Sequence, residues 1–247
     1  AQRGTADAVL TCKEALAGFD GSLLVLSGDC PLITPDTIRE LADMRARSNA
    51  AVVVLTMELD DPFGYGRIIR DGEGRVERIV EQKDANAAEV AVTECNSGFY
   101  CFDAQALFEA LEQVGSDNAQ GEFYLTDVLE ICRGAGRDVL ALPASDVSEC
   151  LGVNSRVQLA AATCALQSRI NKEHMAAGVT MWDPTSVWIG PDVEIAPDVE
   201  LLPQTFLLGK TQVGEDSVIG PNTRLTDTVV GSGCTIDETV AIEARID

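Results

Sequence analysis

Histidine and basic residues are scarce in this 247-residue sequence. The single histidine, His174, falls in the expected helical segment INKEHMAAG, where a surface or packing role is typical. Catalysis by a Ser-His-Asp triad, or by another histidine-based arrangement, is therefore disfavoured. The 40 acidic residues outnumber the 18 lysines and arginines and give a net charge of −22. Such a surface repels phosphate backbones and anionic lipids, so we expect no nucleic-acid or membrane partner, whereas a small phosphorylated ligand remains compatible.

The sequence also lacks a long apolar run and any pair of closely spaced cysteines. No stretch of about 18 apolar residues is present that would span a membrane, and residues 1–4 do not begin a signal peptide. The eight cysteines form no CxxC pair, and their scatter favours buried, reduced thiols in a cytoplasmic protein over a disulfide framework or a zinc site. Because no initiator methionine precedes Ala1, we expect a fragment.

Residues 1–154 alternate strand-like and helix-like segments. Strands are expected at 22–28, 49–59 and 97–103, where apolar residues form short runs typical of buried strands. The segments 67–70 and 76–80, joined by a glycine-rich turn, predict a hairpin. Helices are expected after the capping residues Thr34 and Asp103. Apolar strands that alternate with helices predict an α/β domain with a mixed, mainly parallel sheet.

The segment 155–180 predicts one long helix that links two domains. Ser155 and Gln158 match a capping box at its start, and Gly178 stands where a helix-terminating glycine is typical. The sequence therefore divides into residues 1–154, 155–180 and 181–247.

From residue 187 onward the hydrophobic pattern repeats every six residues. Neither a helix nor a flat strand produces this period, whereas a parallel β-helix of hexapeptides does. Each unit forms one side of a triangular prism, so three units make a coil of about 18 residues. Because the pattern ends at Asp247 without a polar cap, we expect truncation at this end too. The repeating positions are Ile189, Ile195, Leu201, Leu207, Val213, Ile219 and Leu225, followed after one deletion by Val230, Ile236 and Ile242.

An acid directly follows the first apolar strand. Asp29 comes after Ser27 and Gly28 at the carboxyl end of segment 22–28. In an open α/β sheet, ligands bind outside the carboxyl ends of strands, and a carboxylate there can hold a hard cation such as Mg²⁺. The structural alternative is an aspartate that starts the turn before Pro31. These residues alone favour neither interpretation.

Four further segments combine glycine or asparagine with other polar residues. The turn 63–67 (FGYGR) either connects two strands or brings its backbone close to a ligand. In 96–98 (NSG), the Asn96 amide can cap the chain or bind a sugar group. Segment 118–127 (NAQGEFYLTD) is too rich in hydrogen-bonding groups for an ordinary loop. Asn154, in the segment GVN, is either a neighbour of the helix cap or a metal ligand.

Taken in order, these segments resemble a bacterial enzyme family. The resemblance is carried by QRGTADAV, SGDCPLI, FGYGRIIR, VEQKDA, NSGFYCFD, NAQGEFYLTDV, GVNSR, INKEHMAAGV and the hexapeptides from DVEIAP, which span nearly the whole chain. The family is GlmU, the bifunctional N-acetylglucosamine-1-phosphate uridyltransferases and glucosamine-1-phosphate acetyltransferases. The resemblance implies that residues 1–154 are the C-terminal part of a Rossmann-like uridyltransferase (pyrophosphorylase) domain and that 155–180 is its linker helix. Residues 181–247 would begin the left-handed parallel β-helix of the acetyltransferase domain.

The resemblance also implies roles for single residues. Gly4 and Thr5 match the pair that contacts the uridine base. Asp29 matches an acid that binds Mg²⁺ beside the nucleotide phosphates, and Asn154 matches the second Mg²⁺ ligand. The other implied substrate contacts are Ser27 and Gly28 beside Asp29, and, around the N-acetylglucosamine part, Gly66, Glu81, Asn96, Tyr124 and Thr126.

The implied reaction transfers uridylyl from UTP to N-acetylglucosamine 1-phosphate and gives UDP-N-acetylglucosamine and pyrophosphate. The attacking phosphate oxygen is already an anion, so positioning and charge stabilisation suffice and no general base is required. The resemblance further implies Mg²⁺ as cofactor, acetyl-CoA as a substrate of the full-length protein, and a homotrimer formed through the β-helix. It also implies a cytoplasmic role in supplying peptidoglycan and lipopolysaccharide precursors.

The sequence departs from the family pattern at two positions and leaves alternatives open. Asp7 stands where the family usually has histidine, and NSG replaces the commoner NTG. The family's glycine-rich phosphate loop would precede Ala1 and its acetyl-CoA site would follow Asp247, so we expect this chain alone to be inactive. The alternatives are another sugar-1-phosphate nucleotidylyltransferase with a β-helix tail, and a non-catalytic β-helix assembly module.

Overall fold

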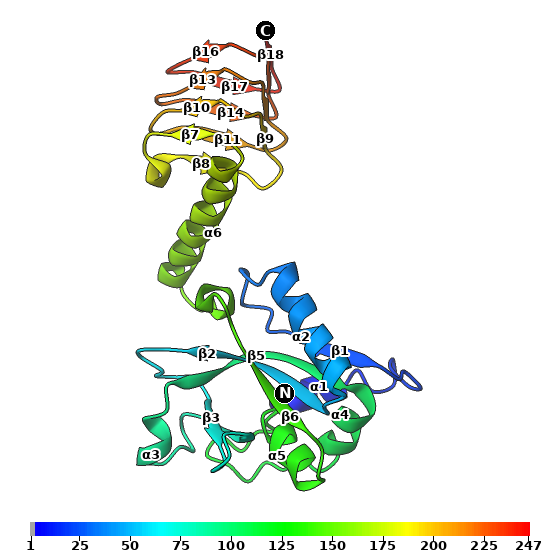
Figure 1. Ribbon diagram of the computed structural model, residues 1–247. Coiled ribbons are helices and arrows are strands. Elements are labelled where there is room, and N and C mark those ends of the chain that lie inside the picture. The colour runs from blue at the N-terminus through cyan, green and yellow to red at the C-terminus, as the bar shows by residue number, and fades with distance from the viewer. Residues whose placement is uncertain (1–2) are drawn as a thin grey trace. The chain divides into compact units, whose positions relative to one another are not determined.

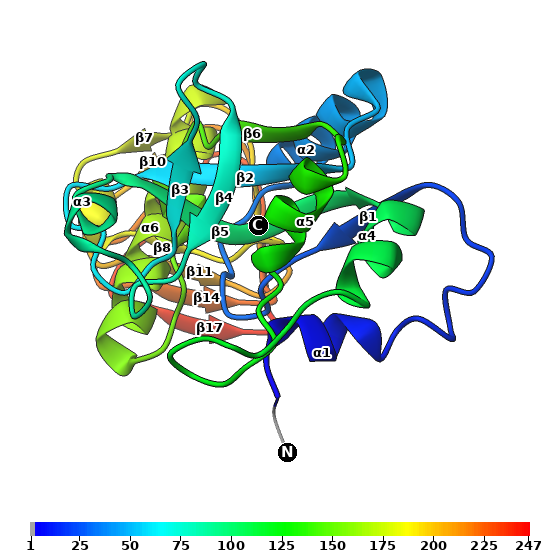
Figure 2. The same ribbon diagram turned by 90° about the horizontal axis from the view of Figure 1, so that it is seen from below.

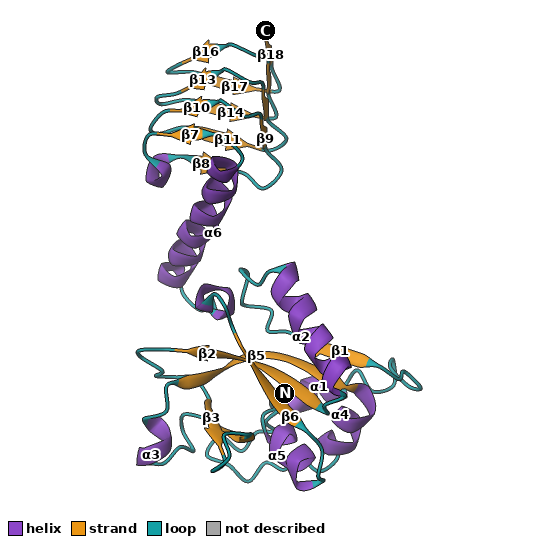
Figure 3. Ribbon diagram, viewed as in Figure 1, coloured by secondary structure: helices purple, strands orange, loops and turns teal. Residues whose placement is uncertain are grey.

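The computed structural model describes residues 3–247, and the contacts within the chain separate two compact units, Ala1–Asn154 and Ser155–Asp247. The first unit is a sheet flanked by helices, and the second combines one long helix with a stack of short strands (Figure 1, Figure 3). Each unit has its own hydrophobic core.

The first unit alternates strands with helices along the chain. Its sheet contains six strands, and their order is β4-β3-β5-β2-β6, with β1 pairing on β5 as well (Figure 2). The elements are α1 (Thr5–Leu10), β1 (Ser22–Val25), α2 (Pro35–Ser48), β2 (Val52–Glu58), β3 (Arg67–Arg70), β4 (Val76–Val80), α3 (Ala87–Val90), β5 (Glu94–Asp103), α4 (Ala104–Leu111), α5 (Asp127–Gly134), β6 (Val139–Pro143) and the 3₁₀ helix η1 (Val147–Cys150).

The expected mixed sheet with a hairpin at one edge is confirmed, because β3 and β4 pair antiparallel. Most of its pairs, however, are antiparallel rather than parallel. Among the described strands of this sheet, only β2 and β6 pair in parallel. The reason is β5, which runs antiparallel to β1, β2 and β3 although these three point the same way. Apolar runs show that a sheet is covered, but they do not give the direction of a strand.

Helices cover both faces of the sheet (Figure 1). On one face α1, α4 and α5 contribute to a core that includes Phe102, Leu107 and Leu129. On the other face α2 and η1 contribute to a core that includes Leu41 and Phe99. The sheet is thus the middle layer of three, which is the usual way to bury strands that are apolar on both faces.

β1 is less buried than its apolar sequence predicts. It spans Ser22–Val25 rather than the expected 22–28. Leu24 is 38% exposed and Leu26 is 40% exposed. Within the described residues β1 pairs with β5 alone, so its second edge has no neighbouring strand there.

The predicted helix starts are confirmed. The Thr34 side chain accepts the N–H of Thr37 at the start of α2. Asp103 Oδ1 accepts the N–H of Ala106 at 2.9 Å at the start of α4. Each side chain satisfies a backbone donor that has no partner in the first turn of a helix, and so fixes where the helix begins.

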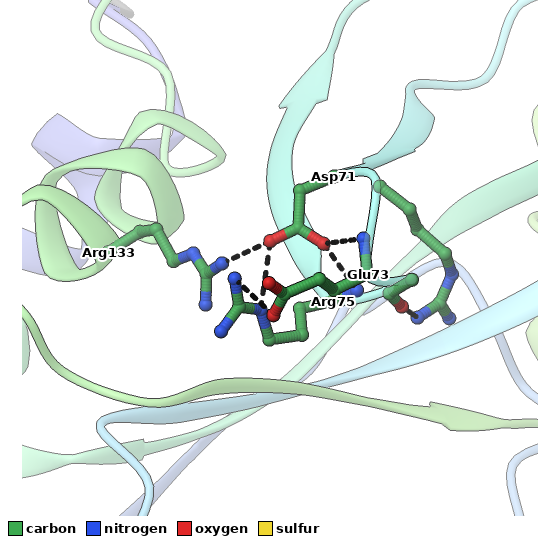
Figure 4. A network of polar contacts seen from close by, with 6 residues as sticks. Asp71, Glu73, Arg75 and Arg133 are labelled. Atoms are coloured by element: carbon green, nitrogen blue, oxygen red, sulfur yellow. Dashed lines mark hydrogen bonds and ion pairs between the residues drawn. The ribbon is translucent and has the colours of Figure 1, made fainter.

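Asp71 holds the β3–β4 turn together (Figure 4). Its Oδ1 accepts the backbone N–H of Glu73 at 2.9 Å and of Arg75 at 3.0 Å. Its Oδ2 accepts from the guanidinium groups of Arg75 at 2.9 Å and of Arg133 at 2.5 Å. The hydrogen bonds from the Arg75 backbone, the Arg75 side chain and the Glu73 backbone, the first of them most, lower the pKa of Asp71 to about 2. Because Arg133 lies on α5, the turn is tied to the helix that covers this face.

The second unit contains the expected parallel β-helix. Its described strands form three parallel sheets of four strands each, and within each sheet the strands of successive coils lie above one another (Figure 1). The elements are α6 (Arg156–Ala176), β7 (Thr180–Met181), η2 (Pro184–Ser186), β8 (Trp188–Ile189), β9 (Glu194–Ile195), β10 (Glu200–Leu201), β11 (Phe206–Leu208), β12 (Gln212–Val213), β13 (Val218–Ile219), β14 (Arg224–Thr226), β15 (Val229–Val230), β16 (Thr235–Ile236), β17 (Val240–Ile242) and β18 (Arg245–Ile246).

The six-residue pattern predicts the interior of this β-helix correctly until its last repeat. Leu207 pairs with Leu225 one coil later, and both are fully buried. At the end of the pattern Ile242 is 59% exposed, and Ala241 takes the inward position opposite Leu225. The expectation for Ile242 is therefore wrong, because a second one-residue deletion lies between Ile236 and Ala241.

Helix α6 packs on the first coil of the same unit. Ser155 Oγ accepts the N–H of Gln158 at its start, and Gly178 follows its end with φ of +103°. The buried Asn171 donates from Nδ2 to the carbonyl oxygens of Pro184 at 2.7 Å and Val187 at 2.9 Å. These bonds satisfy carbonyl groups at the open end of the coil. None of the described helices is apolar and long enough to cross a membrane.

Leu207→Ala should lower the free energy of unfolding of the second unit by about 2–5 kcal/mol, because it opens a cavity in a closely packed interior. The two tryptophans of the sequence, Trp182 and Trp188, both lie in this unit, so their fluorescence during urea denaturation reports its unfolding. The control is Leu208→Ala, whose side chain is half-buried in the same strand and should cost clearly less. Equal losses in the two variants would contradict the assignment of Leu207 to the core.

Candidate functional site

The segment NSG forms a bulge in β5. Residues 97–99 lie opposite the single residue Leu55 of β2. Gly98 adopts φ of +83°, which few residues other than glycine tolerate. Ser97 Oγ donates to the Leu55 carbonyl at 2.7 Å, and Asn96 Oδ1 accepts the Gly98 N–H at 3.0 Å. Asn96 and Ser97 thus satisfy backbone groups that the bulge removes from the ladder of hydrogen bonds.

The bulge lies against the residues that follow β1. A Cβ added at Gly98 would stand 2.5 Å from Ser27 Oγ, so a side chain does not fit there. Ser27 Oγ donates to the Gly98 carbonyl at 3.4 Å. Gly28, the next residue, has no other atom within 4 Å of where its Cβ would be, so its side is open.

A cavity of about 560 Å³ lies between α1, β1 and the bulged strand. Much of its wall is apolar and comes from α1, β1 and the segment between them. A cavity of this size, apolar with a few polar groups, is typical of a small-molecule site. Among the predicted site residues, those that line it are Thr5, Ser27, Glu81, Asn96 and Thr126.

Glu81 is the acid of this cavity. Burial raises its pKa, and the negative charges of Asp84 and Asp127 raise it further. Thr126 Oγ1 donates a hydrogen bond to Glu81 Oε1 at 3.2 Å, and this bond lowers the pKa of Glu81. A half-buried carboxylate in this position is suited to accept hydrogen bonds from ligand hydroxyls.

Gly66 lies between Glu81 and the bulge of β5 and contacts both. Its carbonyl accepts the Asn96 N–H at 2.9 Å. A Cβ at Gly66 would lie 3.4 Å from Glu81 Oε2 and closer still to the Ile79 side chain. The second glycine of FGYG is therefore required by close packing next to the cavity, although Gly66 does not line it.

Gln82 positions the FGYG turn, although no pattern in the sequence singles it out. Its Oε1 accepts the Gly64 N–H at 3.2 Å and the guanidinium of Arg67 at 2.8 Å. Arg67 is only 1% exposed, and its guanidinium also donates to the Tyr65 carbonyl. The buried Arg67 guanidinium and the Gln82 amide therefore hold the turn in place through these hydrogen bonds.

Gly4 and Thr5 pack against the segment that follows NAQGE. A Cβ at Gly4, where φ is +120°, would lie 2.3 Å from the Phe123 carbonyl oxygen. Thr5 Oγ1 accepts the Leu125 N–H at 2.9 Å. The close approach of two backbones thus explains the glycine at position 4. Thr5 holds Leu125 in place, and Thr5 and Leu125 both line the cavity.

Tyr124 lies at a neighbouring cavity of about 570 Å³, which shares Glu81 with the first. Its hydroxyl accepts from Gln120 Nε2 at 2.8 Å. Gln120 Oε1 in turn accepts from Lys83 at 2.7 Å. The NAQG loop is therefore tied to the segment that carries Glu81.

The side chains of Asp29 and Asn154, which are 125 positions apart in the sequence, both lie next to Gly152. A Cβ added at Gly152 would lie 3.1 Å from Asp29 Oδ2 and 3.5 Å from Asn154 Nδ2. The Asp29 carbonyl accepts the Val153 N–H at 2.8 Å, which holds the two segments together. Gly152 thus lies against both a carboxylate and an amide side chain, groups whose oxygens can bind a hard cation such as Mg²⁺.

Such a cation would need further ligands. Across residues 3–247 there is no group of three or more His, Cys, Asp or Glu side chains that could hold a metal alone. Mg²⁺ characteristically takes one or two protein oxygens and completes its shell with phosphate and water. Neither Asp29 nor Asn154 lines the 560 Å³ cavity, but Ser27, two residues before Asp29, does.

Cys30 beside Asp29 is not a nucleophile. Burial, followed by the charge of Asp29, raises the pKa of the Cys30 thiol to about 11. The thiol of Cys150, two residues before Gly152, is similar, because burial raises its pKa to about 12. All eight cysteines are free; Cys12 and Cys164 are exposed, contrary to the expectation of buried thiols, while most of the others are buried.

This chain is similar in sequence to known proteins. Residues 1–182 match the sequence profile of a family described as Nucleotidyl transferase. The chain belongs to the nucleotidyl transferase family. A solved structure titled as a putative glucose-1-phosphate thymidylyltransferase from Bacillus anthracis, in complex with a sucrose, gives a TM-score of 0.49 at 21% identity, over 65% of this chain and 60% of that one.

Curated relatives of this nucleotidyl transferase carry the name Bifunctional protein GlmU. The protein from Lactobacillus helveticus (strain DPC 4571) is 50% identical over 246 residues, which are 100% of this chain and 53% of the relative. The protein from Corynebacterium efficiens is 48% identical over 245 residues, 99% of this chain and 50% of the relative. This nucleotidyl transferase thus spans about half the length of the curated relatives it matches.

Glu81→Gln should change how stability depends on pH. The raised pKa means that the folded state binds the Glu81 proton more tightly than the unfolded state, so this group lowers the free energy of unfolding as pH rises from about 4 through the folded pKa. Without the Glu81 carboxyl, the free energy of unfolding of the variant should rise relative to that of the parent as pH increases from about 4 to the folded pKa. Above that pKa the difference between the two proteins should stay constant. Urea denaturation at a series of pH values measures the difference.

The matched control for this experiment is Glu77→Gln, an exposed carboxylate on β4. A Glu81→Gln difference that stays flat with pH, or falls as pH rises, would contradict the burial of the Glu81 carboxyl.

Proposed function

We propose that the whole protein to which this nucleotidyl transferase chain belongs forms UDP-N-acetylglucosamine and pyrophosphate from UTP and N-acetylglucosamine 1-phosphate, and that this chain alone is inactive. The observation that carries the proposal is that Thr5, Ser27, Glu81, Asn96 and Thr126, from separate segments of the chain, line one cavity. Relatives named Bifunctional protein GlmU, about 50% identical along the whole chain, support it. The proposed domains are residues 1–154 for uridylyl transfer, 155–180 as linker, and 181–247 as the start of the acetyltransferase β-helix.

In the proposed complex the N-acetylglucosamine part occupies the cavity beside the bulge of β5. Glu81 accepts hydrogen bonds from sugar hydroxyls, and Thr126 holds the Glu81 carboxylate in place. Gly66 keeps Glu81 and Asn96 next to each other. Gly4 and Thr5 border the uridine base, and Tyr124 closes the site from the neighbouring cavity. Binding energy spent in this way aligns the sugar phosphate for in-line attack on the α-phosphorus.

Asp29 and Asn154 are the proposed Mg²⁺ ligands. Mg²⁺ bound there would neutralise charge on the phosphate oxygens as the bond to pyrophosphate breaks. Asp29 supplies the anionic oxygen and Asn154 the neutral one, and both side chains lie next to Gly152. Ser27 and Gly28 connect this pair to the sugar cavity along one short stretch of chain.

For the whole protein we propose a second activity, the acetylation of glucosamine 1-phosphate with acetyl-CoA, and assembly as a homotrimer through the β-helix. The three parallel sheets of the second unit support this assembly, since hexapeptide prisms present flat, outward faces. The proposed protein acts in the cytoplasm and supplies precursors of peptidoglycan and lipopolysaccharide.

UDP-N-acetylglucosamine with Mg²⁺ should raise the melting temperature of the first unit, whereas dTDP-glucose and ADP-glucose should leave it unchanged. At about 100 times the dissociation constant, the expected rise is roughly 5–10 °C. Differential scanning calorimetry measures it, and tryptophan fluorescence separates the second unit. A larger shift with dTDP-glucose or ADP-glucose would favour a different nucleotidylyltransferase, and no shift with any nucleotide sugar would favour the assembly module.

Asp29→Asn should weaken the binding of Mn²⁺, a spectroscopic substitute for Mg²⁺, by more than about tenfold in the presence of UDP-N-acetylglucosamine. Electron paramagnetic resonance of free Mn²⁺ measures the affinity. Asp36→Asn, which changes an exposed carboxylate on α2, is the matched control and should bind as the parent does. Equal affinities of the parent and Asp29→Asn would remove Asp29 from the metal site.

A further inference from the structure

The amide of Asn96 has a fixed orientation. Its Oδ1 accepts two hydrogen bonds, from the Gly98 N–H at 3.0 Å and from the Tyr100 hydroxyl at 2.9 Å. A backbone N–H can only donate, so rotating the amide would set two donors against each other. The oxygen therefore stays turned toward β5, and both of its lone pairs are used.

The Asn96 nitrogen is left for a ligand. Within the described residues Asn96 Nδ2 has no protein acceptor, although Asn96 lines the 560 Å³ cavity. A side-chain NH₂ group that faces a cavity without a partner is a donor to whatever occupies that cavity. Glu81 on the same cavity wall is, by contrast, an acceptor.

Packing fixes the position of Tyr100, so its hydroxyl can hold the Asn96 amide in this orientation. It is 3% exposed and pairs with Val25 of β1 and Val54 of β2 on its two sides. Its ring stacks on Phe102 with the centroids 5.3 Å apart. Burial raises the pKa of Tyr100, so its hydroxyl keeps its proton and remains a donor to Asn96.

We propose that Tyr100 is a positioning residue that makes Asn96 a pure hydrogen-bond donor toward the sugar. By occupying the second lone pair of Oδ1, the Tyr100 hydroxyl prevents Asn96 from accepting a bond from the ligand and holds the plane of the amide. The ligand group that this site selects is an acceptor, such as the carbonyl oxygen of an acetamido substituent or a sugar oxygen. The nature of that ligand rests on the proposed function, whereas the orientation of the amide does not.

The first test needs no ligand. In ¹H–¹⁵N spectra of the chain, the side-chain NH₂ pair of Asn96 is identified by its loss in Asn96→Ala. Tyr100→Phe removes only the hydroxyl and should shift this pair, while the NH₂ pair of Asn118, in the NAQG loop, stays in place. An unshifted Asn96 pair in a variant with the parent's melting temperature would overturn the proposal.

The second test is a double-mutant cycle, with UDP-N-acetylglucosamine affinity measured by calorimetry. Tyr100→Phe should weaken binding about fivefold, the typical net effect of one hydrogen bond. In an Asn96→Ala background the same substitution should cause no further loss, because Tyr100 acts through Asn96. UTP alone, which lacks the N-acetylglucosamine group, should bind Tyr100→Phe as tightly as the parent.

The outcomes separate this proposal from the proposed function. A fivefold loss that persists in the Asn96→Ala background, or an equal loss for UTP, would show that Tyr100 acts on the fold rather than on Asn96 and would overturn the proposal. If the parent chain bound no nucleotide sugar, the proposed function would fail, and the shift of the Asn96 pair would still decide whether Tyr100 orients it.

Discussion

The candidate site depends on the position of β5 in the sheet. This strand pairs with β1 and β3 along one edge and with β2 along the other, so its backbone is fixed on both sides. The bulge at residues 97–99 is the one place where the register with β2 shifts, and it brings Gly98 against Ser27, which follows β1. The C-terminal end of β5 is fixed as well, because Asp103 caps α4 and pairs with the buried Arg45. A rigid strand with one local irregularity thus places the polar groups of the cavity.

Local signals in the sequence predict much of this fold. The caps at Thr34 and Asp103, the hairpin turn at Asp71, and the hexapeptide interior each depend on residues that are near one another in the chain, so pattern and propensity suffice. The direction of β5 depends on which distant strands it pairs with, and apolar composition does not encode that choice. The pattern gives the wrong inward residue at Ile242 for a related reason, since too little of the repeat follows the second deletion to reveal it without the pairing partner.

The candidate site was predicted less completely, and mainly through resemblance. Thr5, Ser27, Glu81, Asn96 and Thr126 line one cavity, and Asp29 lies with Asn154 at Gly152. The sequence singles out neither Tyr100, which also lines the cavity, nor Gln82, because each acts through a hydrogen bond to a neighbour, Asn96 or the FGYG turn. The one available signal was a tyrosine inside an apolar strand, whose buried hydroxyl needs a partner. Asp7, which replaces the family's usual histidine, forms an ion pair with Arg3 on the surface of α1 and does not line the cavity.

We propose that the 560 Å³ cavity and the Asp29–Asn154 pair are two parts of one ligand site. A crystal structure of the chain with UDP-N-acetylglucosamine and Mn²⁺, with the anomalous signal of manganese recorded, tests it most directly. We expect an anomalous peak at about 2.1–2.5 Å from an Asp29 carboxylate oxygen, with the sugar ring between Glu81 and Asn96 and the diphosphate between the metal and the sugar. A manganese peak away from Asp29, or a sugar bound outside the cavity that Glu81 and Asn96 line, would contradict it.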